Sequence, residues 1–136
     1  ILILGREAEQ TLEFEDITIQ SMVPEDCREA ATVEEFFQKL QAHDSEFEKL
    51  LKEAESKGEK LRFMATLENG KAKVGLNSLP NAHPFSSLSG SDNMILLTTE
   101  RYLDRPMIIR GPGAGADVTA AGVFADVIRI GNYTRE

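Results

Sequence analysis

The chain has 136 residues, of which 41% are hydrophobic, enough to fill the core of one domain. Its formal net charge is −8, which disfavours nucleic acid and anionic membranes as partners. No apolar run approaches the roughly 18 residues of a membrane span, and no signal-peptide pattern is present. We therefore expect one globular domain.

The cysteine and histidine content predicts no metal site. Cys27 is the only cysteine, which excludes an intrachain disulfide, argues against a cysteine-based metal site and favours a reducing, cytoplasmic location. His43 and His83 stand forty residues apart, without the spacing of metal ligands.

The chain opens on apolar residues without a methionine or a helix start signal. Residues 1–9 are therefore expected to be the end of a helix, in a piece of a longer protein. Alternation of apolar and polar residues over 12–20 predicts one or two half-buried strands, closed by Pro24.

Two capping boxes predict two successive helices. Thr32 with Glu35 starts the first, and Ser45 with Glu48 starts the second, which ends at Gly58. In the second helix the apolar residues recur at helical spacing and predict one buried face, made of Phe47, Leu50, Leu51 and Ala54.

A β-hairpin is predicted next, because alternating residues 61–67 and 72–76 flank Asn69-Gly70, the dipeptide that suits a type I′ turn. Residues 77–93, rich in proline and small polar side chains, are expected to form a long loop. Residues 94–97 predict a further strand.

The stretch 105–131 reads as a strand, a glycine turn and a helix. The strand is predicted at 107–109 and the helix at 116–130, with Gly111, Gly113 and Gly115 between them. Three glycines in five residues permit a ligand to approach the backbone. The helix is apolar nearly all round, so we expect it to be buried on most sides, with another backbone close to Gly122.

This turn has more than one interpretation. Gly111, Gly113 and Ala116 satisfy a loose dinucleotide fingerprint, but no second strand follows and Asp117 would repel a pyrophosphate at the start of the helix. We interpret the turn as one wall of a nucleotide site whose phosphate-binding part lies elsewhere. The alternative is a tight turn whose glycines serve packing alone. The expected fold class is α+β, with a mostly antiparallel or mixed sheet, two adjacent amphipathic helices and a buried C-terminal helix.

The end of the chain resembles the carboxyl end of homoserine dehydrogenases. That family closes with a strand, a G-x-G-A-G turn and the pattern T-A-A-G-V-x-x-D, which this sequence matches from Gly111 to Asp126. Earlier segments resemble the family in the same order along the chain, and they are I-L-I-L-G-R-E, D-I-T-I-Q-S-M-V-P, L-R-F-M-A-T-L and H-P-F-S-S-L-S-G-S-D-N. The resemblance covers nearly the whole chain.

The resemblance implies an oxidoreductase that interconverts L-aspartate 4-semialdehyde and L-homoserine with NAD or NADP, in threonine, methionine and isoleucine biosynthesis. Residues 1–110 would be the distal part of the substrate-binding and dimerisation domain. Residues 111–136 would be the glycine turn and the helix that returns to the nucleotide-binding domain. The cofactor contacts would come from Gly115, Gly113 and Ala114. Thr119 would bond either a ribose or a backbone carbonyl.

The family's catalytic lysine would precede Ile1, so the resemblance implies no catalytic residue here and an inactive fragment. We expect no regulatory domain after the last helix, and in this respect the chain resembles the bifunctional aspartokinase–homoserine dehydrogenase type. A cytoplasmic homodimer or higher homo-oligomer is expected. The alternative function is a non-catalytic oligomerisation or ligand-binding module, whereas a regulatory domain is disfavoured because the two long helices are consecutive.

Overall fold

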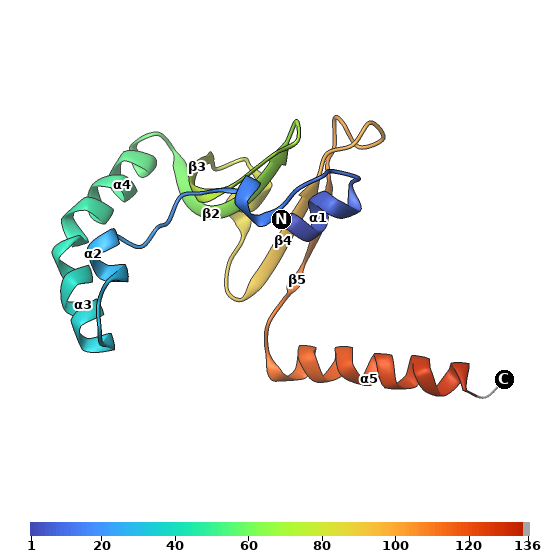
Figure 1. Ribbon diagram of the computed structural model, residues 1–136. Helices are drawn as coiled ribbons and strands as arrows, with labels where there is room; N and C mark the ends of the chain where they lie inside the picture. Colours follow the sequence, from blue (N-terminus) through green and yellow to red (C-terminus); the bar gives the residue numbers. More distant parts are fainter. Residues whose placement is uncertain (135–136) are drawn as a thin grey trace. The chain divides into compact units, whose positions relative to one another are not determined.

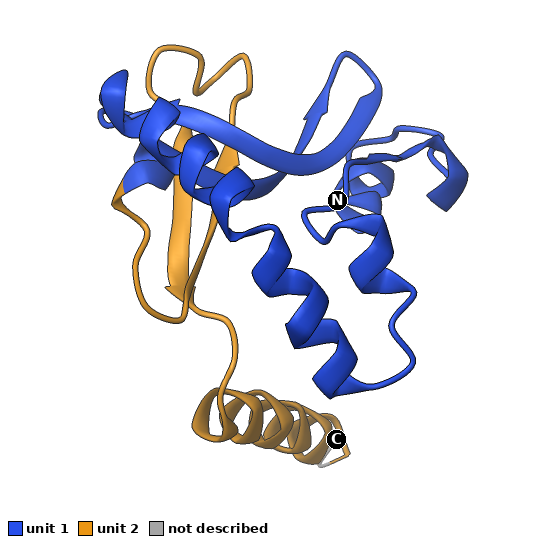
Figure 2. Ribbon diagram, turned by 90° about the vertical axis from the view of Figure 1, so that its left-hand side faces the viewer, with its two compact units in different colours: residues 1–86 blue, residues 87–136 orange. Residues whose placement is uncertain are grey.

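The structure is a computed structural model that describes residues 1–134. The chain divides into two compact units, the first formed by Ile1–Ser86 and the second beginning at Ser87 (Figure 2). Helices accompany a three-stranded sheet and a two-stranded sheet (Figure 1). The predicted α+β fold class is confirmed.

A long hairpin forms the centre of the first unit. Strands β2 (Glu59–Glu68) and β3 (Lys71–Pro80) pair antiparallel over their whole length. The two turn residues have positive φ angles, 50° at Asn69 and 73° at Gly70. This is the backbone that a type I′ turn requires, so the predicted hairpin is confirmed.

Strand β1 (Thr18–Ile19) adds to this hairpin, parallel to β3, and gives the sheet order β1-β3-β2. The prediction of strands over 12–20 was wrong in part, because Phe14–Asp16 form a short 3₁₀ helix, η1. The Asp16 carboxylate accepts a hydrogen bond from the backbone N–H of Glu13 at 2.9 Å. Such local side-chain bonds compete with a strand ladder for the backbone groups.

Four α-helices belong to the first unit: α1 (Leu2–Glu7), α2 (Glu25–Arg28), α3 (Val33–Ala42) and α4 (Asp44–Ser56). The short helix α2 was not predicted from the sequence. The Thr32 cap is confirmed, since its hydroxyl accepts a hydrogen bond from Glu35 N at 3.1 Å. The Glu35 carboxylate reaches back to Ala31 N, at 2.9 Å.

The second predicted capping box is absent. Helix α3 passes into α4 with His43 as the only residue between them, and Ser45 lies inside the first turn of α4. The His43 carbonyl accepts hydrogen bonds from the backbone N–H groups of Glu46 and Phe47. Because the backbone is already helical at Ser45, this residue does not have the extended conformation of an N-cap, and no Ser45 cap forms.

The core of the described residues is small. Its buried hydrophobic side chains are Leu12, Cys27, Ala54 and Ala72. Of the predicted buried face of α4, Ala54 is buried, but Leu50 and Leu51 are 39% and 48% exposed. The expectation of a well-filled core was therefore wrong for this part of the chain, which leaves large apolar side chains uncovered.

The predicted long loop over 77–93 is largely structured. Strand β3 continues to Pro80, a 3₁₀ helix η2 covers Pro84–Ser87, and the next strand begins at Asp92. Hydrogen bonds fix η2 to β2. Arg62 donates from Nε to the Phe85 carbonyl at 2.9 Å and from Nη2 to the Ser86 carbonyl at 3.0 Å.

The second unit consists of a strand pair followed by a helix (Figure 1). Strands β4 (Asp92–Leu97) and β5 (Met107–Pro112) are antiparallel. Helix α5 (Ala116–Tyr133) confirms the predicted terminal helix and extends it. None of the described helices combines the length and apolar character that crossing a membrane requires.

The predicted burial of α5 was wrong within the described residues. All its side chains are exposed, including Phe124 at 63% and Ile130 at 63%. No backbone approaches Gly122, since a Cβ added there would meet open space among the described atoms. An apolar helix forms here without a described surface to cover it, so its hydrophobic free energy is not realised within this part of the chain.

Candidate functional site

The glycine turn between β5 and α5 is shorter than predicted. Gly111 belongs to β5, where it pairs with Asn93 of β4, and Pro112 is also part of the strand. The turn therefore consists of Gly113, Ala114 and Gly115. These are the three residues for which the sequence predicts cofactor contacts.

Gly115 is the N-cap of α5 and has a backbone that only glycine adopts readily. Its φ is 134° and its ψ is 153°, a region closed to side chains by their Cβ atom. Its carbonyl accepts the first helical hydrogen bond, from Thr119 N at 3.1 Å. The space around its Cβ position is open for 4 Å among the described residues. The backbone at Gly115 is thus accessible to a ligand.

Gly113 is required for a different reason, which is a close approach from β4. A Cβ added to Gly113 would overlap Nδ2 of Asn93 and lie 2.7 Å from its Cγ. The Asn93 carboxamide therefore occupies the place of a side chain at Gly113. Sequence reasoning missed Asn93, because this contact depends on the register of β4 against β5.

The charges around the turn limit the kind of ligand that fits there. Helix α5 has no side-chain cap, so its first N–H groups remain available as donors, but Asp117 places a carboxylate in the same turn. Arg110 is paired with Asp92, with 2.9 Å between Nε and the carboxylate oxygen. A neutral, flat group with hydrogen-bonding atoms suits this wall better than a phosphate does. The nicotinamide ring of the reduced cofactor meets that description, so these residues fit the predicted cofactor.

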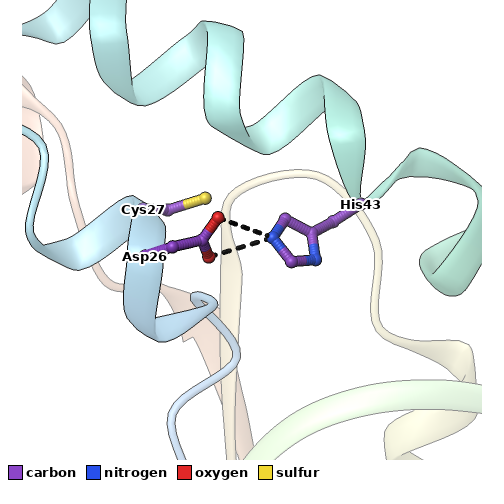
Figure 3. A group of neighbouring side chains, drawn as sticks. All are labelled: Asp26, Cys27 and His43. Atoms are coloured by element: carbon purple, nitrogen blue, oxygen red, sulfur yellow. Dashed lines mark hydrogen bonds and ion pairs between the residues drawn. The ribbon is translucent and has the colours of Figure 1, made fainter.

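A second cluster lies in the first unit, where no site was predicted. Asp26 and Cys27 on α2 lie beside His43 at the junction of α3 and α4 (Figure 3). Nε2 of His43 lies 2.9 and 3.1 Å from the two Asp26 carboxylate oxygens. One ligand-type atom from each of the three residues lies within 4.8 Å of the others.

The neighbours of His43 shift several protonation equilibria. Hydrogen bonds that the ring donates to the carboxylates of Asp26 and then Glu46 raise the pKa of His43 above its usual value. The hydrogen bond with His43 in turn lowers the pKa of Asp26. Burial raises the pKa of the Cys27 thiol, with the Asp26 charge adding to the shift. In the absence of another cation, the cluster therefore favours an imidazolium next to a carboxylate and a neutral thiol.

Comparison with known proteins decides the family. Residues 1–128 match the family model described as homoserine dehydrogenase. The chain belongs to the homoserine dehydrogenase family. The resemblance predicted from the glycine turn and the preceding segments is confirmed.

The relatives of the chain include proteins named bifunctional aspartokinase/homoserine dehydrogenase and proteins named homoserine dehydrogenase. It is 44% identical over 135 residues to bifunctional aspartokinase/homoserine dehydrogenase 1, chloroplastic, of Zea mays, covering 98% of this chain and 15% of that protein. It is 40% identical over 130 residues to homoserine dehydrogenase of Saccharomyces cerevisiae, covering 94% of this chain and 35% of the yeast protein. The chain thus spans about a third of the yeast protein.

A solved structure has the same fold. A crystal structure of a Candida auris protein of unknown function superposes with a TM-score of 0.86 at 40% identity, covering 96% of this chain and 37% of that chain. The chain therefore shares its fold with a segment of a larger protein whose structure was determined by experiment.

Proposed function

We propose that this chain is part of an oxidoreductase that interconverts L-aspartate 4-semialdehyde and L-homoserine by hydride transfer with NADP or NAD. Family membership supports a homoserine dehydrogenase role in amino-acid biosynthesis, here assigned to the supply of threonine, methionine and isoleucine. The observation that carries the proposal is the accessible Gly115 backbone at the start of α5.

In this proposal the turn orients the cofactor from one side. The backbone of Gly115 contacts the nicotinamide portion, while Gly113 and Ala114 line the same wall. Bound NADPH or NADH supplies the hydride, and the protein supplies position and surroundings. The Gly115 conformation matters because a Cβ there would both strain the backbone and fill the space that the ring needs. The ribose contact of the Thr119 hydroxyl stays a prediction.

We also propose that the two parts of the chain belong to different domains of the enzyme. Residues 1–110 belong to the distal substrate-binding and dimerisation region, and residues 111–136 return to the nucleotide-binding domain. Exposed apolar side chains on α5 support this assignment, because they suit a surface contributed by another domain. We assign no catalytic residue to this chain. Since it spans 35% of the yeast relative, we expect no turnover by the chain alone.

A chimera tests the function directly. The aligned segment of the yeast enzyme is replaced by this chain, and homoserine oxidation is measured together with the secondary structure and oligomeric state. We expect an active chimera, whereas the isolated chain should oxidise NADPH with aspartate semialdehyde only at the background rate. A folded, correctly assembled chimera without activity would overturn the assignment.

The role of the turn is tested inside the same chimera. Gly115→Val should raise the KM for the cofactor by about tenfold or more while the KM for homoserine changes little, because only the cofactor wall is altered. Gly131→Ala is the matched control, since it adds a methyl group in open space farther along the same helix. Equal effects of both substitutions on both substrates would refute the cofactor contact.

A second candidate function is a non-catalytic oligomerisation module. Phe63 on β2 and Ile19 on β1 are 50% and 52% exposed and could pair copies of the chain. We propose a homodimer or higher oligomer, which sedimentation velocity at increasing concentration tests. A monomer throughout would remove this candidate without affecting the chimera. A cytoplasmic location is proposed as well, and fractionation of cells that express the full-length protein tests it.

A further inference from the structure

The cluster of Asp26, Cys27 and His43 combines three kinds of metal ligand from two parts of the fold. Asp26 and Cys27 come from α2, and His43 comes from the α3–α4 junction (Figure 3). A carboxylate oxygen, a thiol sulfur and an imidazole nitrogen are the three ligand types that Zn²⁺ takes in proteins. The Asp26 carboxylate and the His43 ring already lie within hydrogen-bonding distance, and the Cys27 sulfur lies within 4.8 Å of both.

The orientation of the imidazole is set by a second carboxylate. Nδ1 of His43 lies 3.3 Å from Oε2 of Glu46, three residues further along α4. When Nδ1–H donates to Glu46, the lone pair of Nε2 faces Asp26, and the thiol of Cys27 lies alongside. A carboxylate on the distal nitrogen is the usual outer support of a histidine ligand, because it fixes the tautomer and raises the basicity of the ring.

The three residues differ in burial, so the cluster has one side that is closed to solvent and one that is open to it. Cys27 is 1% exposed, whereas the Asp26 side chain is 53% exposed and that of His43 is 24% exposed. An ion can thus reach Asp26 and Nε2 from solvent. Zinc bonds of about 2.0 to 2.3 Å place tetrahedral ligands roughly 3 to 4 Å apart. The three ligand atoms lie within 4.8 Å of one another, so small side-chain movements complete the site.

We propose that Asp26, Cys27 and His43 form a Zn²⁺ site, with Glu46 as its outer support and water as the fourth ligand. The site is separate from the glycine turn and does not depend on the proposed function. Binding replaces protons by the metal: Zn²⁺ forms a bond to the Cys27 sulfur as the thiol proton leaves to solvent, and a bond to Nε2 as any proton there leaves. The site therefore binds more tightly as the pH rises.

Cobalt provides a spectroscopic test on the 136-residue chain, because Co²⁺ takes zinc's place and reports its ligands. Purified, reduced and chelator-treated protein is titrated with Co²⁺ and then with Zn²⁺. We expect a saturable 1:1 signal with a sulfur-to-cobalt charge-transfer band in the near ultraviolet, abolished by Zn²⁺. Cys27→Ser should remove that band, and Asp26→Asn and His43→Gln should each weaken binding by more than about tenfold.

Two further variants separate the site from a general effect of the fold. Glu46→Gln should weaken zinc binding by about tenfold, as loss of an outer support does, while the charge-transfer band is retained. His83→Gln is the matched control, since His83 is the other imidazole of the first unit and Nδ1 accepts a hydrogen bond from Phe85 N. It should bind cobalt as the unaltered protein does.

Three results would overturn the proposal. Cobalt that binds without the sulfur band, or binding that His43→Gln leaves unchanged, would show that the cluster holds only a hydrogen-bonded imidazolium. Circular dichroism of each variant identifies those that fail to fold. Because the Asp26 side chain is 53% exposed, Asp26→Asn should not disturb the packing around Cys27. Loss of metal binding in this variant, with an unchanged circular dichroism spectrum, would support the site, and unchanged binding would overturn it.

Discussion

At the scale of single residues, His43 links stability to pH. Asp26 and Glu46 raise the pKa of His43 in the folded protein, so folding is favoured by a bound proton. This stabilisation is complete below about pH 6.5, the ordinary value for histidine, and is lost as the pH rises through the raised value. The lowered pKa of Asp26 acts in the opposite direction. The ionised Asp26 carboxylate stabilises the fold above the ordinary pKa range of carboxyl groups, and this stabilisation is lost as the pH falls and the group is protonated.

Thermal unfolding with a chelator present should therefore show a Tm that falls as the pH is raised from about 6.5. His43→Gln should flatten this dependence, and His83→Gln should leave it as it is. A Tm of the unaltered protein that rises across the same range would contradict the assigned sign. The effect is expected to be modest, because the carboxylates are largely exposed to solvent.

Gly113 and Asn93 provide a second test at this scale. Gly113→Ala should destabilise the second unit by about 1 to 3 kcal/mol, since the new methyl group overlaps the Asn93 carboxamide. Asn93→Ala should remove the overlap, so the double variant should recover most of the loss. Urea unfolding of both single variants and the double variant measures the coupling, and strictly additive effects would show that the two residues do not meet.

Residue-level predictability depended on whether the signal was local. Thr32 and the Asn69-Gly70 turn were correctly predicted, because a cap and a type I′ turn are determined by adjacent residues. Ser45 gave the same kind of local signal, but the cap predicted there is absent, because α4 already begins after His43. The contact of Gly113 with Asn93 could not be predicted, since it arises from strand register.

At the scale of elements, Arg62 provides two of the hydrogen bonds that hold the segment after β3, while Lys60 Nζ and the Ser86 hydroxyl provide others. Arg62 on β2 donates hydrogen bonds to the carbonyls of Phe85 and Ser86 in η2. Arg62→Lys loses this two-carbonyl geometry and should cost about 1.5 to 3 kcal/mol. Amide hydrogen exchange should then become faster in η2 while it changes less in the β2–β3 hairpin. Arg101→Lys, in an exposed turn, is the control, and unchanged exchange in η2 would contradict the role of Arg62.

This element also explains why a loop was expected over residues 77–93. Two prolines and several small polar residues do indicate irregular backbone, and part of the segment is irregular. The composition did not reveal that β3 runs to Pro80 or that Ser86 is buried, with its hydroxyl donating to the Pro80 carbonyl at 2.8 Å. Those features depend on β2, a neighbour in space.

At the scale of the whole molecule, the apolar surface of α5 should add to the self-association of the isolated chain. Phe124 and Val127 are 63% and 57% exposed on this helix. Replacing both by glutamate should lower concentration-dependent self-association and dye binding, while the unfolding of the first unit stays unchanged. Arg129→Gln on the same helix is the control. Association that persists unchanged in the double variant would place the contact on another surface.

The family and fold class could be predicted from the sequence, while the extent of burial could not. Hydrophobic content showed only that a core was possible. Much of that content lies on α5 and other exposed faces, and the described residues bury few large side chains. The zinc cluster escaped prediction for a related reason: Asp26 and His43 are 17 residues apart and meet only because α2 packs beside α3.

Helices α3 and α4 meet at His43 without a loop between them. One residue ends the first helix and begins the second, so its backbone angles, a φ of −93° and a ψ of 0°, set the direction in which α4 leaves α3. Helices of 10 and 13 residues extend from this one residue. A small change in its backbone angles would therefore move the far end of each helix by much more than it moves His43 itself.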